Sequence, residues 1–380
     1  METHVSAPQR LLELDEVLDL DLGYICKQLA QEFAQMSGKK LLITGGAGFL
    51  GYYFTLSALH WNKLNKGRAP IAVTMVDNFR RGTPGWLESA KRDPNLVLRS
   101  DDMSLPLAAD FAVGDYTIHA AGIASPPFYR KWPLETIDAN INGLRNLLDQ
   151  CRARAKAGNP VSGFLFMSSS EIYGDPPAAN IPTPEDFRGI VSCTGPRACY
   201  DESKRFGETI CVVYAQQYGL PVRMARPFNN YGPGLKITDR RVLPDFMRDM
   251  LGGKDIVLLS DGSPTRTFCY AADAVVGYYK ALVRGRAGEP YNVGTETPEV
   301  SMREVAQRVV DLGHRYVGYK GTVKLGVAEE SNYLVDNPNR RCPIITKART
   351  ELGYEPSITL DDGLYRLLSW YMFNRTAEEA

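Results

Sequence analysis

The chain has 380 residues, of which 44% are hydrophobic and 23% are charged, and its mean hydropathy is −0.25. These values are typical of a folded globular protein and exclude a disordered or collagen-like chain. The 44 basic and 44 acidic residues cancel, so the chain lacks the positive field of a nucleic-acid-binding protein, and we expect a small-molecule ligand instead.

Residues 1–38 are predicted to form an N-terminal helical extension. Ile25, Leu29 and Phe33 recur at the spacing of one amphipathic helix, and Gly38 follows as its stop signal. The sequence leaves open whether this extension is a dimer contact, a lid or an inert addition.

From residue 39 the pattern changes to short apolar runs separated by helical stretches. The runs lie at residues 41–43, 71–76, 116–118 and 164–167. Their apolar residues are continuous rather than alternating, which is typical of parallel strands covered on both faces. The predicted fold class is therefore α/β, a doubly wound parallel sheet of the Rossmann type with a smaller C-terminal substrate-binding lobe.

The same pattern divides the chain into lobes. Residues 39–226 are predicted to form the Rossmann domain, to which segments near 264–294 return. Beyond Arg226, loops rich in proline and glycine interrupt the regular alternation. We therefore assign residues 227–263 and 295–380 to the smaller lobe.

Composition also limits where the protein works and what it binds. No segment approaches the roughly 18 apolar residues of a membrane-spanning helix, and the first ten residues lack the apolar core of a signal peptide. We therefore expect a cytoplasmic protein with no membrane partner. The seven cysteines include no Cys-x-x-Cys pair and there are four histidines, so we expect neither a disulfide framework nor a metal site.

The first predicted strand leads directly into a glycine-rich turn that opens a helix. Gly45 permits the tight turn, Gly48 lets the backbone approach a pyrophosphate, and Gly51 lets helix and strand pack closely. Three glycines also fit ordinary turns, but their position after a strand favours an NAD-binding Rossmann domain. The cofactor residues predicted in this turn are Gly45, Gly48, Phe49, Leu50 and Gly51.

The second apolar run ends at Asp77, where a carboxylate would accept the ribose hydroxyls of NAD. Arg80 and Arg81 lie just downstream and are suited to clasp a 2′-phosphate, so NADP remains an alternative. Further cofactor contacts are expected from positions that follow this strand and the next two, namely Asn78, Asp102, Met103, Ala120 and Ala121.

Tyr200 and Lys204 are four residues apart and therefore share one helix face. They follow the strand 164–167, after which come Ser169 and Glu171. A free tyrosine has a pKa near ~10, and a nearby ammonium and a cationic nicotinamide both favour its phenolate. We predict that Tyr200 takes the proton of a sugar hydroxyl oriented by Ser169, and that Tyr200 and Lys204 also contact the cofactor. The alternative is a buried tyrosine beside a solvated lysine.

Several longer segments extend this pattern. They are residues 124–127 (ASPP), 169–176 (SSEIYGDP), 195–204 (GPRACYDESK), 226–233 (RPFNNYGP), 265–268 (TRTF) and 340–343 (RRCP). Together they resemble the extended short-chain dehydrogenase/reductases of the NAD-dependent epimerase/dehydratase family, and among these most closely the UDP-glucuronate decarboxylases. The likeness covers about residues 39–371, and segment 195–204 is the most diagnostic.

The resemblance implies a redox-neutral reaction. Carbon 4 of UDP-glucuronate is oxidised by NAD, the carboxylate leaves as carbon dioxide, and reprotonation at carbon 5 and hydride return give UDP-xylose. By the same resemblance Glu171 works at carbon 5, and Arg341 pairs with the carboxylate or delivers a proton. The smaller lobe binds the nucleotide sugar, and the implied substrate contacts are Ser125, Pro126, Arg197, Asn229, Arg266 and Arg341.

Residue 170 separates related activities within this family. The dTDP-glucose 4,6-dehydratases carry an Asp there, which protonates the departing hydroxyl, whereas this chain has Ser170. The 4-epimerases usually lack the following Glu. Ser170 together with Glu171 therefore favours decarboxylation, and the alternatives are a dehydratase, an epimerase or a non-catalytic nucleotide-binding regulator.

The resemblance also implies a homodimer. In this family, helices corresponding to residues 133–151 and 200–217 pair with those of a second subunit as a four-helix bundle. Both segments carry apolar stripes at helical spacing.

Overall fold

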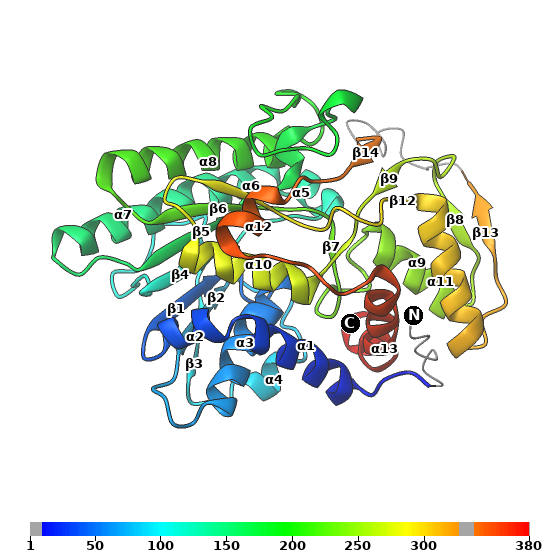
Figure 1. Ribbon diagram of the computed structural model, residues 1–380, viewed down its shortest axis with the longest axis horizontal. Helices are drawn as coiled ribbons and strands as arrows, with labels where there is room; N and C mark the ends of the chain where they lie inside the picture. The colour runs from blue at the N-terminus through cyan, green and yellow to red at the C-terminus, as the bar shows by residue number, and fades with distance from the viewer. Residues whose placement is uncertain (1–9, 327–337, 380) are drawn as a thin grey trace.

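The centre of the protein is a seven-stranded parallel sheet with strand order β11-β6-β5-β4-β1-β2-β3 (Figure 1). The structure is a computed structural model that describes residues 10–326 and 338–379. The sheet strands are β1 (Lys40–Thr44), β2 (Ala72–Asp77), β3 (Leu96–Ser100), β4 (Tyr116–His119), β5 (Gly163–Met167), β6 (Val222–Pro227) and β11 (Pro290–Val293). The predicted doubly wound α/β fold is thereby confirmed.

Helices surround this sheet, and shorter strands lie outside it. The α-helices are α1 (Leu14–Gln28), α2 (Ala30–Met36), α3 (Phe49–Leu64), α4 (Leu87–Ala90), α5 (Pro126–Lys131), α6 (Pro133–Asp138), α7 (Leu144–Lys156), α8 (Ala198–Tyr218), α9 (Val242–Leu251), α10 (Ala271–Arg284), α11 (Met302–Tyr316), α12 (Thr346–Leu352) and α13 (Leu360–Glu379). Short 3₁₀ turns lie at Ser170–Tyr173 and Ala178–Asn180, and a π-helical turn lies at Ala139–Gly143. The shorter strands are β7 (Asn230–Tyr231), β8 (Ile256–Leu258), β9 (Thr265–Arg266), β10 (Cys269–Tyr270), β12 (Val300–Ser301), β13 (Val323–Leu325) and β14 (Arg340–Arg341).

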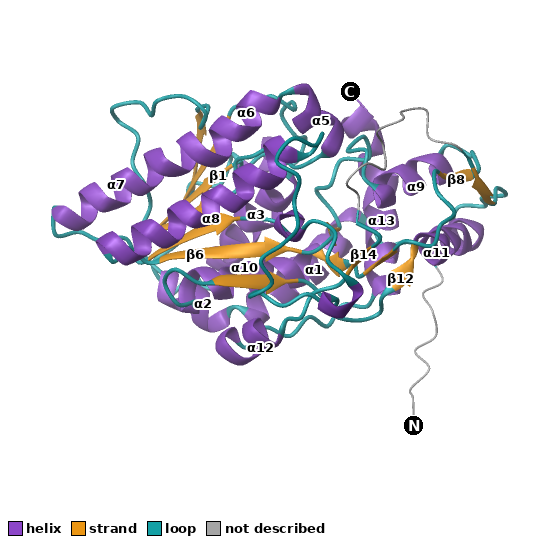
Figure 2. Ribbon diagram, turned by 90° about the horizontal axis from the view of Figure 1, so that it is seen from above, coloured by secondary structure: helices purple, strands orange, loops and turns teal. Residues whose placement is uncertain are grey.

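Both faces of the sheet are buried. Leu41 and Ile43 of β1 belong to one apolar cluster, together with side chains of α3 and α10, whereas Leu42 belongs to a second cluster with α7 and α8. Figures 1 and 2 show these helix pairs on opposite sides of the strands. Because alternate side chains of a strand point to opposite faces, Leu41, Leu42 and Ile43 each have an apolar surface to contact. This explains the continuous apolar runs in the sequence.

The N-terminal extension differs from its prediction. It contains two helices, α1 and α2, because the backbone of Leu29 leaves helical geometry at φ −106° and ψ 19°. The N–H of Leu29 still donates to the carbonyl of Ile25 at 2.9 Å, so the chain direction changes without a loop. Ile25 and Phe33 are fully buried against the body of the protein.

A buried carboxylate anchors the extension. Asp21 of α1 accepts hydrogen bonds from Tyr53 of α3 and from Tyr270 of β10, the latter at 2.6 Å. It also pairs with Arg366 of α13 at 2.6 Å. The extension thus contacts both the sheet region and the C-terminal helix.

The C-terminal elements gather beyond the carboxyl ends of the sheet strands, at the right of Figure 1. Strand β9 is central in a small sheet of order β12-β9-β14, in which Arg341 is in register with Arg266. Helix α13 begins after Thr359, whose hydroxyl accepts a hydrogen bond from the N–H of Asp362 at 3.2 Å. Strands β9 and β14 contribute Arg266 and Arg341 to one wall of the site described next.

Within residues 10–326 and 338–379, none of the helices is both long and apolar enough to cross a bilayer, and no group of three or more His, Cys, Asp or Glu side chains could hold a metal ion. All seven cysteines are free thiols.

Candidate active site

A cavity of about 500 Å³ lies between the carboxyl ends of the sheet strands and the C-terminal elements. All the site residues predicted from the sequence line it. The predicted cofactor residues in its lining are Gly45, Gly48, Phe49, Leu50, Gly51, Asp77, Asn78, Asp102, Met103, Ala120, Ala121, Tyr200 and Lys204. The predicted catalytic and substrate residues in its lining are Ser125, Pro126, Ser169, Glu171, Arg197, Tyr200, Lys204, Asn229, Arg266 and Arg341.

The glycine-rich turn between β1 and α3 admits no side chain at two positions. Gly45 has φ +71°, and a Cβ there would lie 2.6 Å from the carbonyl oxygen of Ala120. A Cβ on Gly51 would lie 2.3 Å from the carbonyl oxygen of Gly46. The turn therefore packs against the end of β4, and the N-terminus of α3 faces the cavity, where its N–H groups can bind an anion.

Asp77 stands at the end of β2, beside this turn. Its carboxylate accepts from the N–H groups of Ala47 at 3.0 Å and Phe79 at 2.8 Å, and burial raises its pKa. The downstream arginines have carboxylate partners. Arg80 pairs with Asp102 at 3.6 Å and with Glu135 at 3.1 Å, and Arg81 pairs with Asp239 at 2.7 Å. This end of the cavity is suited to ribose hydroxyls rather than to a 2′-phosphate.

Tyr200 and Lys204 lie on the face of α8 that points into the cavity. Burial raises the pKa of Tyr200 to about 12, although a hydrogen bond with Ser169 lowers it. Burial also lowers the pKa of Lys204 to about 7. The ammonium donates to the carbonyl of Met167 at 2.7 Å, and it lies 5.7 Å from the centre of the Tyr200 ring. Burial, together with the negative charges of Glu171 and Asp201, therefore raises the pKa of the phenol in the protein by itself, whereas the lowering expected from the sequence also depends on a cationic nicotinamide.

Glu171 is held by two arginines. Both Arg341 nitrogens donate to its carboxylate, one of them at 2.6 Å, and Arg197 donates to the same oxygen Oε2. Burial alone would raise the pKa of Glu171, but Arg341 and Arg197 lower it to about 2. The carboxylate is therefore ionised at neutral pH. Arg341 is 8% exposed, so it lies in the buried wall of the cavity rather than in a solvated turn.

Arg266 and Asn229 complete this end of the cavity. The Arg266 guanidinium donates to main-chain carbonyls, including that of Asn339 at 3.1 Å. Burial and the neighbouring Arg341 lower its pKa to about 9. Asn229 has φ +42°, and its amide donates to the carbonyl of Thr267 at 2.8 Å. Arg266 makes no ion pair with the described residues, so its charge is available to an anionic ligand.

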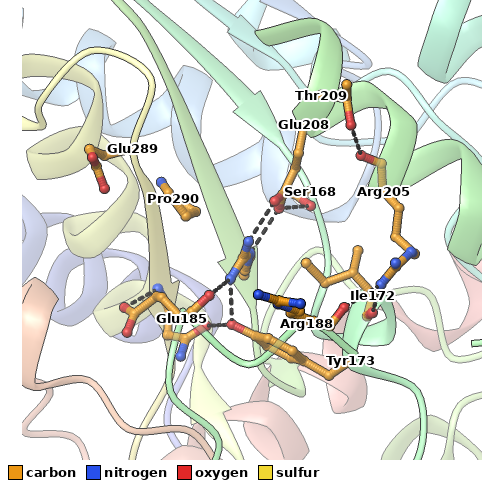
Figure 3. A network of polar contacts seen from close by, with 12 residues as sticks. Ser168, Ile172, Tyr173, Glu185, Arg188, Arg205, Glu208, Thr209, Glu289 and Pro290 are labelled. Carbon is orange, nitrogen blue, oxygen red and sulfur yellow. Dashed lines mark hydrogen bonds and ion pairs between the residues drawn. The ribbon is translucent and has the colours of Figure 1, made fainter. Parts of the chain in front are cut away.

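A buried ion pair supports the loop that carries Ser169 and Glu171 (Figure 3). Arg226 of β6 pairs with Glu208 of α8 at 2.6 Å, and Glu208 also accepts from the Ser168 hydroxyl at 2.6 Å. Arg226 further donates to the Tyr173 hydroxyl at 2.7 Å. The network thus connects β6, α8 and both ends of the loop. No local pattern predicts it, because its members are far apart in the chain.

Two other residues of the site were not predicted. The Tyr129 ring stacks on that of Tyr200, with centroids 5.2 Å apart and an interplanar angle of 11°. Asn140 lies in the π-helical turn, where its amide donates to the Ser203 hydroxyl at 2.9 Å. The sequence feature nearest to Tyr129 was the motif 124–127, which ends two residues before it.

Comparison with known proteins places the chain in a family. Residues 41–294 match the model of the NAD dependent epimerase/dehydratase family. The chain belongs to this family. UDP-glucuronic acid decarboxylase 6 of Arabidopsis thaliana is 35% identical over 328 residues, covering 86% of this chain and 87% of the relative. UDP-glucuronic acid decarboxylase 1 of Xenopus tropicalis is 34% identical over 368 residues, covering 97% and 79%.

A solved structure has the same fold. It is a double mutant of DesIV, a dTDP-glucose 4,6-dehydratase of Streptomyces venezuelae, with NAD and DAU bound. Its TM-score is 0.74 at 26% identity, and the match covers 89% of this chain and 98% of that one. The resemblance to the NAD-dependent epimerase/dehydratase family that the motifs predicted is confirmed.

The cavity of this epimerase/dehydratase family member fits NAD. A Cβ on Gly45 would collide with the backbone of Ala120 and Ala121, just after β4. The turn can therefore keep this conformation only with glycine at position 45. Asp77 presents a carboxylate beside it, and the small side chains of Ala120 and Ala121 leave space for a flat ring system.

Proposed function

We propose that the protein is an NAD-dependent decarboxylase that converts UDP-glucuronate to UDP-xylose. Its relatives named UDP-glucuronic acid decarboxylase support this proposal. The observation that carries it is the Glu171 carboxylate held between Arg197 and Arg341, next to Ser170. Two buried guanidiniums there suit a ligand that brings a carboxylate to the site.

The larger domain would bind NAD, and the smaller lobe would bind the nucleotide sugar. The domain of residues 39–226, with returning segments near 264–294, holds NAD through the glycine turn and Asp77. The lobe of residues 227–263 and 295–380 holds the nucleotide sugar together with Arg197 and Arg266 of the larger domain. Arg197, Asn229 and Arg266 bind the sugar and its diphosphate, since the planar guanidinium binds phosphate oxygens in pairs.

Tyr200 is the base for the first step. It removes the proton of the hydroxyl at carbon 4, while Ser169 hydrogen-bonds the same oxygen and Lys204 supplies positive charge near the ring. When bound, NAD accepts a hydride from carbon 4 and later returns it, and its positive charge favours the phenolate. Together these charges lower the phenol pKa from the value of about 12 set by burial.

Loss of the carboxylate follows from this oxidation. The 4-keto sugar is a β-keto acid, so its carboxylate leaves as carbon dioxide and the electrons remain as an enolate. One proton is then added at carbon 5, and the balance is UDP-glucuronate plus one proton to UDP-xylose plus carbon dioxide. Arg341 holds the carboxylate or delivers the proton, and the ionised Glu171 acts beside carbon 5.

The decisive experiment follows the carboxyl carbon. Purified protein receives a catalytic amount of NAD and UDP-glucuronate labelled at that carbon. We expect labelled carbon dioxide and unlabelled UDP-xylose in equal amounts. A nucleotide-sugar product that keeps the label would overturn the proposal and point to an epimerase or dehydratase.

Ser170 offers a second comparison between related activities. A serine hydroxyl cannot act as the acid that expels a 6-hydroxyl near neutral pH. Ser170→Asp should therefore confer measurable dehydration of a dTDP-hexose, whereas Ser170→Asn should not. Equal activity of both variants would show that residue 170 does not separate the two reactions.

We also propose a homodimer built on α6 and α8. These neighbouring helices expose large apolar side chains, including Leu134 at 70% and Phe206 at 55%. Such a patch is expected at a subunit interface. Light scattering should give twice the chain mass, and Phe206→Glu should give the mass of one chain. A monomer at micromolar concentration would refute the dimer.

A further inference from the structure

Asp201 is a buried carboxylate beside the site that the proposed chemistry leaves unused. It follows Tyr200 in α8 and is 4% exposed. Its Oδ2 accepts one long hydrogen bond, of 3.5 Å, from Arg197 Nε. Its Oδ1 is buried and has no hydrogen-bond partner among the described residues. Buried oxygens are normally satisfied, so this one needs an explanation.

Arg197 stands between two carboxylates. It donates through Nη2 to Glu171 and through Nε to Asp201. Glu171 also receives both Arg341 nitrogens, so it takes most of the hydrogen bonds that the two arginines offer. Asp201 is thus the carboxylate with fewer partners in a cluster of two acids and two guanidiniums.

Asp201 and Glu171 differ strongly in pKa. Burial and the negative charge of Glu171 raise the pKa of Asp201 to about 7, whereas that of Glu171 is lowered to about 2. Such separation is expected when two interacting acids share one site. The charged and titratable groups that face Asp201 are Arg197, Cys199 and Tyr200 of its own segment, Glu171 of the neighbouring loop, Arg341 of β14 and Tyr129 of α5.

A hexuronate substrate would bring a third carboxylate to the same two guanidiniums. We propose that Asp201 is a positioning residue that takes up a proton from solvent when this carboxylate binds, so that Arg197 and Arg341 can be shared with the substrate. This inference rests on the proposed function, since it needs a ligand with a carboxylate. UDP-xylose has none and would bind without proton uptake.

The pH dependence follows from proton linkage. When Asp201 is protonated in the complex and has a pKa of about 7 in the free protein, binding is favoured below this pH and weakens above it. Between pH 7 and pH 8 the Kd of UDP-glucuronate should rise about fivefold. The Kd of UDP-xylose should change less than about twofold over the same interval.

Calorimetry of the NAD-loaded Tyr200→Phe protein, which should not consume the ligand, tests this directly. UDP-glucuronate and UDP-xylose are each titrated at pH 8 in phosphate and in Tris, two buffers with different ionisation enthalpies. We expect the binding enthalpy of UDP-glucuronate to differ between the buffers by close to one proton per site. The enthalpy of UDP-xylose should be the same in both. Equal enthalpies for UDP-glucuronate would overturn the proposal.

Variants assign the proton to Asp201 rather than to Lys204, whose pKa is also about 7. In the same background, Asp201→Asn should abolish the buffer dependence and keep the Kd at pH 8 at or below the parental value. If the Asp201→Asn protein does not fold, the Asp201→Ser variant is used in its place. Glu202→Gln, on the exposed side of α8, should leave the proton uptake unchanged. Persistence of the uptake without the Asp201 carboxylate would refute its role.

Failure of this proposal can be told apart from failure of the proposed function. If the unmodified protein releases carbon dioxide from UDP-glucuronate but binding takes up no proton, only the role of Asp201 is wrong. If UDP-glucuronate neither binds nor loses carbon dioxide, the proposed substrate itself is wrong.

Discussion

At the scale of single residues, the site depends on burial and charge acting against each other. Burial raises the pKa of Tyr200 to about 12 and lowers that of Lys204 to about 7, so burial shifts each group toward its neutral form while Lys204 still titrates near neutral pH. Glu171 is the opposite case, because Arg341 and Arg197 overcome its burial and keep it charged. The environment, more than the residue type, therefore decides which group can accept a proton.

The role of Tyr200 can be tested by removing its hydroxyl. Tyr200→Phe should lower kcat for carbon dioxide release by about 10²–10⁴-fold, since a positioned base is lost. Binding of NAD, measured by fluorescence titration, should change little. Tyr214→Phe removes a hydroxyl from the same helix and should leave kcat within about twofold of the parent. An unchanged rate in Tyr200→Phe would show that another base acts.

Glu171 should contribute stability that depends on pH. Its pKa is about 2 in the folded protein and 4.5 ordinarily, so the contribution is complete above pH 4.5 and is lost as the pH falls toward 2. The stability difference between the parent and Glu171→Gln should therefore shrink by about 2 kcal/mol between pH 5 and pH 3, as measured by urea denaturation. A difference that stays constant over this range would contradict the assigned pKa.

At the scale of secondary-structure elements, loops are held in place by buried polar pairs from distant segments. Arg226 of β6 and Glu208 of α8 fix the loop after β5 through Ser168 and Tyr173. Arg341 and Arg266 lie side by side because β14 pairs with β9. The cavity wall is thus assembled from short elements that have little stability alone.

Glu208→Gln tests the first of these pairs. Removing one charge of a buried pair leaves Arg226 uncompensated, so the free energy of unfolding should fall by about 3–5 kcal/mol. The kcat should fall as well, because Ser168 and Tyr173 lose their shared anchor. Glu202→Gln breaks an exposed pair with Arg205 on the same helix and should cost less than about 1 kcal/mol. Equal effects of the two variants would argue against a special role for the buried pair.

At the scale of the whole molecule, the N-terminal extension packs against both the sheet region and the C-terminal helix α13. Asp21 of α1 binds Tyr53 next to the sheet and Arg366 on α13. The sequence left open a dimer contact, a lid or an inert addition for the extension. These buried contacts make the extension part of the packed body of the protein, an arrangement that was not among those alternatives.

Asp21→Ala should therefore weaken the whole fold. The loss of a fully buried acid should lower the free energy of unfolding by about 3–5 kcal/mol in urea denaturation. Trypsin should also cleave the N-terminal segment faster than in the parent. Asp19→Ala, an exposed position of the same helix, should behave like the parent within about 0.5 kcal/mol. Normal stability of Asp21→Ala would show that the extension packs through its apolar side chains alone.

The sequence by itself determined the elements whose signals are local. Continuous apolar runs predicted β1, β2, β4 and β5 because burial on both faces requires apolar residues at every position. The glycine turn was recognisable because the close approach of Gly45 to the segment after β4 excludes any side chain there. Asp77 was recognisable because it ends the second apolar run. The resemblance of short motifs then placed Ser169, Glu171, Tyr200 and Lys204 in one site, and the structure brings them to one cavity.

Only the tertiary structure decided how these groups are partnered. Arg341 pairs with Glu171 although the two residues are 170 positions apart in the chain, and the orphaned oxygen of Asp201 is unpaired because its surroundings bury it. The break of the extension at Leu29 and the raised pKa of Tyr200 also arise from packing against distant elements. Burial and ion pairing depend on which segments meet in space, and a linear pattern of residue types does not contain that information.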